Sequence, residues 1–393
     1  MSLFNEDKRE LGKEGMNEGD MEPSAAAGAL SSPLPVQQSV LQQRYVRGED
    51  EQPKVAHDRF EREEELPVID LAVLACGSEH DKSNCRLRML RACQEWGFFR
   101  LVNHSLPIHL MRQMDAAARR FFSLSLDEKL ENKDPEGGTL GYCSGAQDGY
   151  NLQGYWQESL QFPGEKDTRK AFLDRTMQHN RNDFRDVMEE YCENVHKLAE
   201  KLTEHLAVAL GLPSAHFSKN CSPSVVRFSF YPPCPDPAST LGVVPHTDAF
   251  VVTILQQDDV SGLQILKDGN WITVRTQPDT LIVNVGDMLQ IWSNDILSSV
   301  VHRVVVNSES SRLTTALFFG PIPKIVIQPH SDLATAEHPL QKFRPFTFEE
   351  YMGTVERAEL VGKDVLDSFR VYHTSIDEQV TNLAQLTEAI SAK

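Results

Sequence analysis

Residues 263–274 read LQILKDGNWITV, and this stretch decides the fold class. It holds two short apolar runs, Leu263–Leu266 and Trp271–Val274, joined by Lys267-Asp-Gly-Asn270. An Asp-Gly pair tolerates the positive φ angles of a tight primed turn, so the pattern predicts a two-stranded antiparallel hairpin. The second half of the chain is therefore expected to be built from β-strands.

Further short β-rich runs flank the hairpin. They are Val225–Tyr231, Phe250–Leu255, Thr280–Val283, Val300–Val306 and Leu313–Phe319. Many short strands separated by turn residues predict an antiparallel sandwich or barrel. In the first half, apolar residues at intervals of three and four predict helices at 84–95, 108–122 and 183–210, with a buried strand at 96–103. Helices are expected again at 347–359 and 376–391.

Composition excludes several classes of function. The chain has 393 residues, with 39 Lys and Arg against 57 Asp and Glu, a net charge of −18. Because phosphate binding needs a basic face, this balance argues against nucleic acid as a partner. The 7 cysteines form no C-x-x-C pair, so neither a disulfide framework nor a structural zinc site is indicated.

The same composition bears on location. No apolar run approaches the roughly 18 residues that a membrane span needs, so no membrane partner is expected. The N-terminus is acidic before any apolar segment, unlike a secretory or transit signal. We expect a cytoplasmic monomer, with a nuclear share left open. The charge runs and the segment SAAAGALSSPLP at 24–35 predict a disordered acidic tail over residues 1–64.

The residues that indicate chemistry are His246-Thr-Asp248 and, much later, His302. Residues i and i+2 of a strand project from the same face, so His246 and Asp248 can bind one ion if a distant strand supplies His302. Two imidazoles and one carboxylate leave three coordination positions open, as in non-haem Fe(II) oxygenases. A chance occurrence is equally open on this motif alone, since His330-Ser-Asp332 repeats it in what we interpret as a surface loop.

Arg312-Leu-Thr314 follows His302 and again places two polar side chains on one face of a strand. A guanidinium offers a planar fork for a carboxylate, and a neighbouring hydroxyl adds a donor. Beside an iron site, this pair predicts an anchor for the far carboxylate of a dicarboxylic cosubstrate. Without such a site, the arginine would only mark the exposed end of a strand.

Seven strings together resemble one family. They are 92–104 (ACQEWGFFRLVNH), Tyr231-Pro-Pro-Cys234, His246-Thr-Asp248, Gly262-Leu-Gln264, Asn284-Val-Gly-Asp287, His302-Arg-Val304 and Arg312-Leu-Thr314. In order and approximate spacing they are similar to the plant 2-oxoglutarate- and Fe(II)-dependent dioxygenases, the group similar to isopenicillin N synthase. The resemblance extends from about Leu66 to Phe369. It departs at Thr314, where the family usually has Ser, and at Ser229, where it often has Asn.

The resemblance implies an α+β fold: a distorted double-stranded β-helix, or jelly roll, flanked by N-terminal helices. It divides the chain into a helical dioxygenase region at 65–215, a catalytic β-helix domain at 216–325 and a C-terminal helical segment at 326–393. It implies Fe(II) held by His246, Asp248 and His302, with 2-oxoglutarate as cosubstrate and ascorbate as reductant. Arg312, Thr314 and Tyr231 would then bind the distal carboxylate.

The implied reaction couples oxidative decarboxylation of 2-oxoglutarate, with O2, to hydroxylation or desaturation of a plant small molecule such as a flavonoid, a hormone or another specialised metabolite. Strand alternation makes Phe318 a candidate substrate wall, with core packing equally open. The resemblance adds Tyr142 and Arg227 as substrate contacts. Arg227 could meet an acidic substrate, or it could form a structural ion pair.

Two other functions fit the same fold. A relative of this kind can oxidise its substrate without 2-oxoglutarate, which the ratio of succinate to product would reveal. A catalytically silent binding protein could keep the barrel without turnover, although the presence of all three candidate ligands argues against it.

Overall fold

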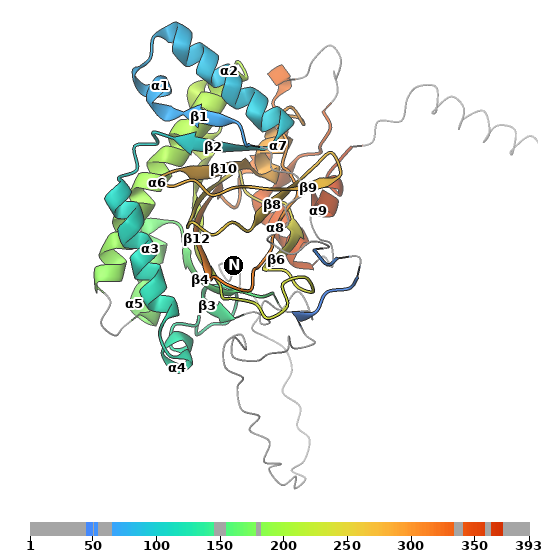
Figure 1. Ribbon diagram of the computed structural model, residues 1–393. Helices are drawn as coiled ribbons and strands as arrows, with labels where there is room; N and C mark the ends of the chain where they lie inside the picture. Colours follow the sequence, from blue (N-terminus) through green and yellow to red (C-terminus); the bar gives the residue numbers. More distant parts are fainter. Residues whose placement is uncertain are drawn as a thin grey trace, which may run out of the picture.

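The computed structural model describes residues 45–49, 51–53, 65–144, 155–177, 182–333, 341–357 and 363–371. Two β-sheets face each other across a barrel-like interior, with helices on the outside (Figure 1). The main sheet has eight strands in the order β1-β2-β10-β7-β12-β5-β4-β3, and the smaller sheet has four in the order β6-β11-β8-β9. This arrangement is a distorted jelly roll, as expected.

Strands of the main sheet come from both halves of the chain. They are β1 (Val68–Asp70), β2 (Phe98–Val102), β3 (Gly141–Ser144), β4 (Glu158–Pro163), β5 (Cys221–Tyr231), β7 (Val252–Gln257), β10 (Leu281–Val285) and β12 (Arg312–Pro321). The smaller sheet holds β6 (Val243–His246), β8 (Leu263–Lys267), β9 (Asn270–Thr273) and β11 (His302–Val304). A two-stranded pair, β13 (Val326–Ile327) and β14 (Phe346–Thr347), precedes the last helices.

The helices cover the outside of the barrel. They are α1 (Leu71–Cys76), α2 (Glu79–Glu95), α3 (Ile108–Phe122), α4 (Leu126–Leu130), α5 (Lys166–Thr176), α6 (Asn182–Ala209), α7 (Asp287–Trp292), α8 (Phe348–Arg357) and α9 (Lys363–Asp367). Figure 1 shows α3 and α6 along one side of the main sheet, where both contact β12. No helix in the described ranges combines the length and the apolar character needed to cross a membrane.

Alternation along β5 and β12 separates the core from the interior of the barrel. Val226, Phe228 and Leu317 are each no more than 1% exposed and belong to the core shared with the helices. The residues of opposite parity, including Arg227 and Arg312, therefore face inward. Alternate residues of these strands therefore pack in the hydrophobic core, and the residues between them line the interior of the barrel.

Local predictions hold where the local signal is strong. The helix predicted at 108–122 is observed with those bounds as α3, whose apolar residues form one buried face. The hairpin joins β8 and β9, and its turn residues Asp268 and Gly269 have φ angles of 50° and 77°. The predicted primed turn is confirmed, because both central residues adopt the positive φ that it requires.

The regions predicted at 65–215 and 216–325 share one β-sheet. Strands β1 to β4 lie before residue 216, yet they form both edges of the sheet that contains β5, β7, β10 and β12. Residues 65–215 are therefore not a separate helical region. The short strands β1 and β3 carry too little periodicity to be detected, and β4 is buried along its whole length, so its pattern does not alternate.

The prediction of a disordered tail over 1–64 is wrong for one short segment. Tyr45 and Arg47 are 1% and 3% exposed. The Tyr45 ring packs edge-on against Trp156 at 5.2 Å between centroids, and the backbone N–H of Arg47 donates to the carbonyl of Ser239. A buried aromatic contact of this kind outweighs the polar composition around it. Most of 1–64, and the helix predicted at 376–391, lie outside the described residues.

Candidate metal centre

Three side chains meet where strand β6 ends and strand β11 begins. His246 ends β6, and His302 begins β11 directly opposite it in the strand register, while Asp248 follows β6 by two residues. The Nε2 atoms of both histidines lie 3.7 Å from Oδ1 of Asp248. One ligand atom from each residue lies within 4.8 Å of the other two. Atoms so placed can surround one metal ion with bonds of about 2 Å.

Both imidazoles are held so that Nε2 points to this point of convergence. His246 Nδ1 lies 2.8 Å from the carbonyl oxygen of Val244, and His302 Nδ1 lies 3.1 Å from that of Val300. A carbonyl can only accept, so each Nδ1 carries a proton, which makes Nε2 the ligand atom of the neutral ring. The backbone of the two strands therefore selects the tautomer that a metal ligand needs.

Asp248 is oriented by two neighbouring strands. Thr253 Oγ1 of β7 donates to Asp248 Oδ2 at 2.6 Å, and Asn284 Nδ2 of β10 donates to the same oxygen at 2.7 Å. Oδ2 is thus saturated, and Oδ1 remains free on the side of the two histidines. Asn284 belongs to a string that carried the family resemblance, but Thr253 had no signal in the sequence, since it contacts Asp248 only through the fold.

The electrostatics fit a cation. Burial lowers the pKa of His246 to about 4, and the nearby His302 ring adds to this shift. Burial alone would raise the pKa of Asp248, but the two histidines and the donated hydrogen bonds lower it below its ordinary value. At neutral pH the site therefore offers one carboxylate together with a neutral His246 imidazole, which is the charge state that binds a divalent metal.

The predicted carboxylate anchor lies further inside the barrel. Arg312 pairs with Tyr231 across β12 and β5, and its guanidinium carbon lies 5.3 Å from the Tyr231 ring centroid. Nε of Arg312 donates to the carbonyl of Val260, and one terminal nitrogen donates to Gln257 Oε1. The other terminal nitrogen, Nη1, is buried without a partner among the described residues. Thr314 is 5% exposed and projects from the same face as Arg312.

Two predicted substrate residues also face the interior. Phe318 continues the alternation from Arg312 and lies across from Thr253, and its ring is 5.0 Å from that of Phe250. Arg227 lies between Ala316 and Gln161 in the register, close enough to His246 for its charge to lower the pKa of that histidine. Its Nε is buried without a hydrogen bond to any described residue.

The prediction that Tyr142 contacts the substrate is wrong. Tyr142 pairs with Leu160, which pairs with Phe228, so its side chain lies on the outer face of the main sheet. It is 1% exposed, and its hydroxyl donates to Glu158 Oε2 at 2.8 Å. Lys129 Nζ donates to the same oxygen at 2.6 Å. The parity of a short edge strand decides this, and that parity was not readable from the sequence.

Phe250 and Phe348 join Phe318 in an aromatic wall, and the sequence did not indicate either of them. Phe250 contacts both Phe318 and, at 5.9 Å between centroids, Phe348 of α8. Gly320 lies under the Phe250 ring, where an added Cβ would come within 2.8 Å of it. Phe348 enters only because the C-terminal helix packs back onto the barrel, and no local pattern signals such a contact.

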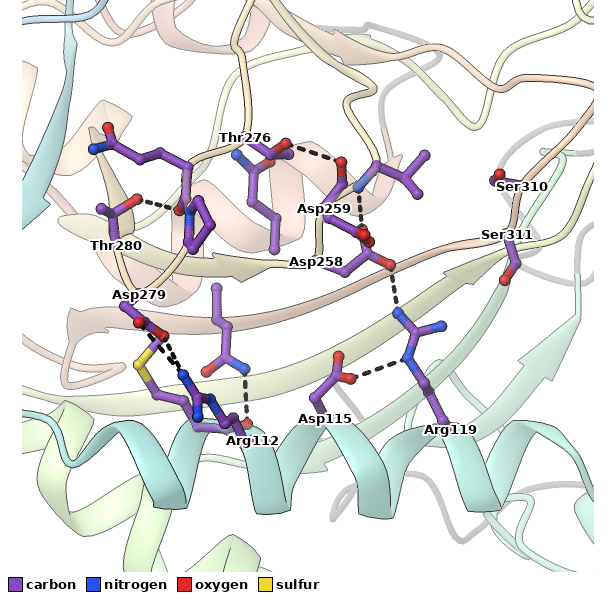
Figure 2. Close-up of a pocket in the computed structure, with 16 residues that line it drawn as sticks. Arg112, Asp115, Arg119, Asp258, Asp259, Thr276, Asp279, Thr280, Ser310 and Ser311 are labelled. Carbon is purple, nitrogen blue, oxygen red and sulfur yellow. Dashed lines mark hydrogen bonds and ion pairs between the residues drawn. The ribbon is translucent and has the colours of Figure 1, made fainter.

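A polar cleft of about 870 Å³ lies between α3 and the loops that follow β7 and β9, and Gln256 and Gln257 at the end of β7 form part of its lining (Figure 2). Its arginines are already paired. Arg119 of α3 donates to Asp115 and to Asp258, and Arg112 lies 3.4 Å from Asp279. Asp258 also accepts from the backbone N–H of Leu313 at 2.6 Å. The cleft therefore holds the start of β12 in place and contains none of the three candidate metal ligands.

Comparison with known proteins agrees with this geometry. Residues 221–321 match the 2OG-Fe(II) oxygenase superfamily, and residues 66–185 match the family described as non-haem dioxygenase in morphine synthesis N-terminal. Gibberellin 2-beta-dioxygenase 8 of Arabidopsis thaliana is 34% identical, over 75% of this chain and 83% of its own. Flavanone 3-dioxygenase of Petroselinum crispum is 35% identical, over 77% of this chain and 84% of its own.

Solved structures are similar over most of their length. The crystal structure of JOX2 in complex with 2OG, Fe and JA has a TM-score of 0.73 and 31% identity, and covers 86% of this chain and 97% of its own. The dioxygenase for auxin oxidation in rice has a TM-score of 0.68 and 29% identity, covering 78% of this chain and all of its own. The jelly roll is therefore common to this chain and to these enzymes.

Proposed function

The chain belongs to the 2-oxoglutarate- and Fe(II)-dependent oxygenase superfamily, and from this premise we propose a role for each side chain of the site. His246, Asp248 and His302 hold Fe(II), while Arg312, Thr314 and Tyr231 hold the distal carboxylate of 2-oxoglutarate. One observation carries the assignment: three ligand atoms lie within 4.8 Å of one another, and the same barrel holds a buried arginine nitrogen that has no partner among the described residues. A facial set of two histidines and one carboxylate leaves three positions for cosubstrate and dioxygen.

The chain is a 2-oxoglutarate-dependent dioxygenase. In hydroxylation, one oxygen atom of O2 enters succinate and the other enters the C–H bond of the substrate, with release of carbon dioxide. In desaturation, the substrate loses two hydrogens, which leave as water with the second oxygen atom. Iron and 2-oxoglutarate, when bound, supply the activation of dioxygen and the oxidising power.

The residues of this chain position the reactants. Thr253 and Asn284 fix the Asp248 carboxylate, and the strand carbonyls of Val244 and Val300 fix the two imidazoles. The apolar wall of Phe250, Phe318 and Phe348 limits the access of water to the reacting C–H bond. Such fixed geometry is what separates hydroxylation from unproductive turnover, because small displacements cost large factors in rate.

For the substrate, we infer a small organic acid with an apolar body. Arg227 lies inside the barrel with a buried Nε that has no partner in the described part of the chain. A buried guanidinium nitrogen without a partner is costly, and a carboxylate matches the planar fork of an arginine. The aromatic wall near Phe318 suits the remainder of such a molecule. Relatives named as a jasmonate-induced oxygenase, a gibberellin 20 oxidase and a dioxygenase for auxin oxidation make plant hormones the first group to test.

The remaining assignments follow the composition. A net charge of −18 supports a protein without nucleic acid partners. We place it in the cytoplasm as a monomer, with ascorbate keeping the iron reduced. Gel filtration combined with light scattering tests the monomer, and imaging of a fluorescent fusion tests the location.

The deciding experiment measures succinate. The protein is purified anaerobically with Fe(II), and oxygen is admitted with 2-oxoglutarate and a panel of plant phenolics and organic acids, each acid paired with its methyl ester. We expect an acid to stimulate succinate formation well above its ester. Product without succinate would indicate a 2-oxoglutarate-independent oxidase, and tight binding without product would indicate a silent binding protein.

A matched pair of variants tests Arg227. We expect Arg227→Met to remove the preference for the acid over its ester, while Arg112→Met, an exposed arginine on the outside of α3, retains it. If wild-type protein accepts ester and acid equally, the assignment of an acidic substrate is wrong.

A further inference from the structure

The cosubstrate anchor has a neighbour that the sequence did not single out. Gln257 ends β7, and in the strand register it lies directly across from Thr314 of β12. Cross-strand partners project from the same face, so Gln257 faces the interior together with Thr314 and Arg312. Gln256, the residue before it, pairs with Thr315 and donates outward to the carbonyl of Met111 in α3.

Gln257 touches Arg312 directly. A terminal nitrogen of Arg312 donates to Gln257 Oε1 at 3.2 Å. The guanidinium has only donors, so this contact fixes the amide orientation: Oε1 faces the arginine and Nε2 faces away from it. The amide therefore holds one edge of the guanidinium and presents a second donor of its own.

Two donors remain without partners at this contact. Gln257 Nε2 and Arg312 Nη1 are both buried, and neither has a hydrogen-bond partner among the described residues. The 3.2 Å contact joins Arg312 Nη2 to Gln257 Oε1. Nη1 shares the carbon Cζ with Nη2, and Nε2 shares the carbon Cδ with Oε1. Both free donors therefore lie directly next to this contact. Buried donors are nearly always satisfied, and two that are not point to a missing acceptor between them.

The surrounding charges favour an anion as that acceptor. Arg312 makes no ion pair in the described part of the chain, and its Nε is occupied by the carbonyl of Val260. Burial lowers its pKa, with Tyr231 and the charge of Asp258 opposing this shift. Asp258 itself forms an ion pair with Arg119 (Figure 2) and accepts from the backbone N–H groups of Val260 and Leu313. The positive charge of Arg312 thus remains unpaired at the contact with Gln257.

We propose that Gln257 is a fourth side chain of the cosubstrate site, which donates from Nε2 to the distal carboxylate of 2-oxoglutarate while its Oε1 holds the Arg312 guanidinium in place. The donors then come from three adjacent strands: Gln257 from β7, Arg312 and Thr314 from β12, and Tyr231 from β5. This inference rests on the proposed cosubstrate site. It makes Gln257 a determinant of selectivity for dicarboxylic over monocarboxylic 2-oxo acids.

The test is a titration of Fe(II)-loaded protein by calorimetry without oxygen, so that no turnover is involved. Two ligands are compared: 2-oxoglutarate, and 2-oxopentanoate, which has a methyl group in place of the distal carboxylate. We expect Gln257→Met to weaken binding of 2-oxoglutarate about ten- to hundredfold, the range for losing a hydrogen bond to a charged group. Binding of 2-oxopentanoate should change less than about twofold.

The variant Gln257→Glu removes the proposed donor to the carboxylate while it keeps an acceptor for Arg312. A glutamate keeps the acceptor for Arg312 but replaces the donor by a negative charge, so it should bind 2-oxoglutarate more weakly than Gln257→Met does. If Gln257→Glu binds 2-oxoglutarate as well as wild type, or if Gln257→Met keeps wild-type affinity, no donor is needed at this position and the proposal is refuted. Gln256→Met is the matched control, with the same change one residue away on the outer face, and should leave both affinities unaltered.

The outcomes distinguish this inference from the function it rests on. Wild-type protein that fails to bind 2-oxoglutarate would contradict the proposed function itself. Wild-type binding with unchanged affinity in Gln257→Met would overturn the role of Gln257 alone. An equal loss for both ligands, with unaltered circular dichroism, would show a general effect on the pocket and would likewise overturn it.

Discussion

Replacing Thr253 by valine should weaken iron binding without removing any proposed ligand. The two side chains have nearly the same shape, so the change deletes one hydroxyl and little else. Thr253 is 4% exposed, and its hydroxyl donates to Asp248 Oδ2 at 2.6 Å from a neighbouring strand. The variant therefore tests whether the hydrogen bonds behind Asp248 contribute to metal affinity.

The expected loss of Fe(II) affinity depends on the hydrogen bond that Asp248 keeps in the variant. Hydrogen bonds to charged groups contribute about 1.5 to 3 kcal/mol, and loss of a partner that orients a metal ligand typically costs about ten- to hundredfold in affinity. Asn284 still donates to the same oxygen at 2.7 Å, so the carboxylate keeps one of its two restraints. We therefore expect the dissociation constant for Fe(II) to rise about tenfold, and about a hundredfold when Asn284→Leu is added.

The assay is an anaerobic competition titration with a chromogenic Fe(II) chelator. Thr203→Val is the control, because Thr203 is also fully buried, but its hydroxyl donates to the carbonyls of Ala199 and Glu200 within α6. It should lower the unfolding free energy by about 1 kcal/mol and leave iron affinity unchanged. Wild-type affinity in Thr253→Val, or an equal loss in Thr203→Val, would refute the reasoning.

Three further predictions concern the anchor, the core and a buried acid. Arg312→Met should raise the dissociation constant of 2-oxoglutarate about a hundredfold or more, measured by anaerobic calorimetry, since it removes a buried fork; a change below tenfold contradicts the anchor. Tyr142→Phe should lower the unfolding free energy, measured in urea, by about 1 kcal/mol. Lys129→Met should lower it by about 3 to 5 kcal/mol, because it leaves the buried Glu158 charge without its cation. Neither variant should alter the KM of the substrate. Burial raises the pKa of Asp287 to about 6 from 3.8, so the native state holds its proton longer than the unfolded chain does. Stability should therefore fall by about 2 kcal/mol as pH rises from 4 to 6, and Asp287→Asn should remove this part of the slope in urea titrations; parallel curves for the two proteins would contradict it.

Much of the fold was predictable because its signals are local. The bounds of α3 follow from apolar residues at intervals of three and four, and the turn at Asp268-Gly269 follows from two residues that tolerate positive φ. The convergence of His246 and Asp248 was predicted from their i, i+2 spacing, and it holds although β6 ends at His246. These features depend on residues a few positions apart, whose relation is set by backbone geometry before any packing occurs.

The predictions that failed depend on contacts between residues far apart in the sequence. The family resemblance pointed to Tyr142 as a substrate contact, yet the register of β3 against β4 turns it toward Glu158 and away from the interior. Tyr45 lies in a segment with a polar composition, but it packs on Trp156, more than a hundred positions along the chain. A shift of one residue in register, or one distant partner, reverses such assignments, and neither can be read from a neighbouring residue.

The amino-acid sequence alone determined the class of this protein: a β-barrel with helices outside it, two histidines and one aspartate for a metal, and an arginine for a carboxylate. Tertiary structure decided which of two adjacent glutamines faces the anchor, because Gln256 and Gln257 differ only in the side of the sheet on which they lie. It also decided which donors hold Asp248, since Thr253 and Asn284 reach it from β7 and β10, the strands that pair beside it. Chain periodicity sets which residues share a face, whereas only the pairing of distant strands sets what that face meets.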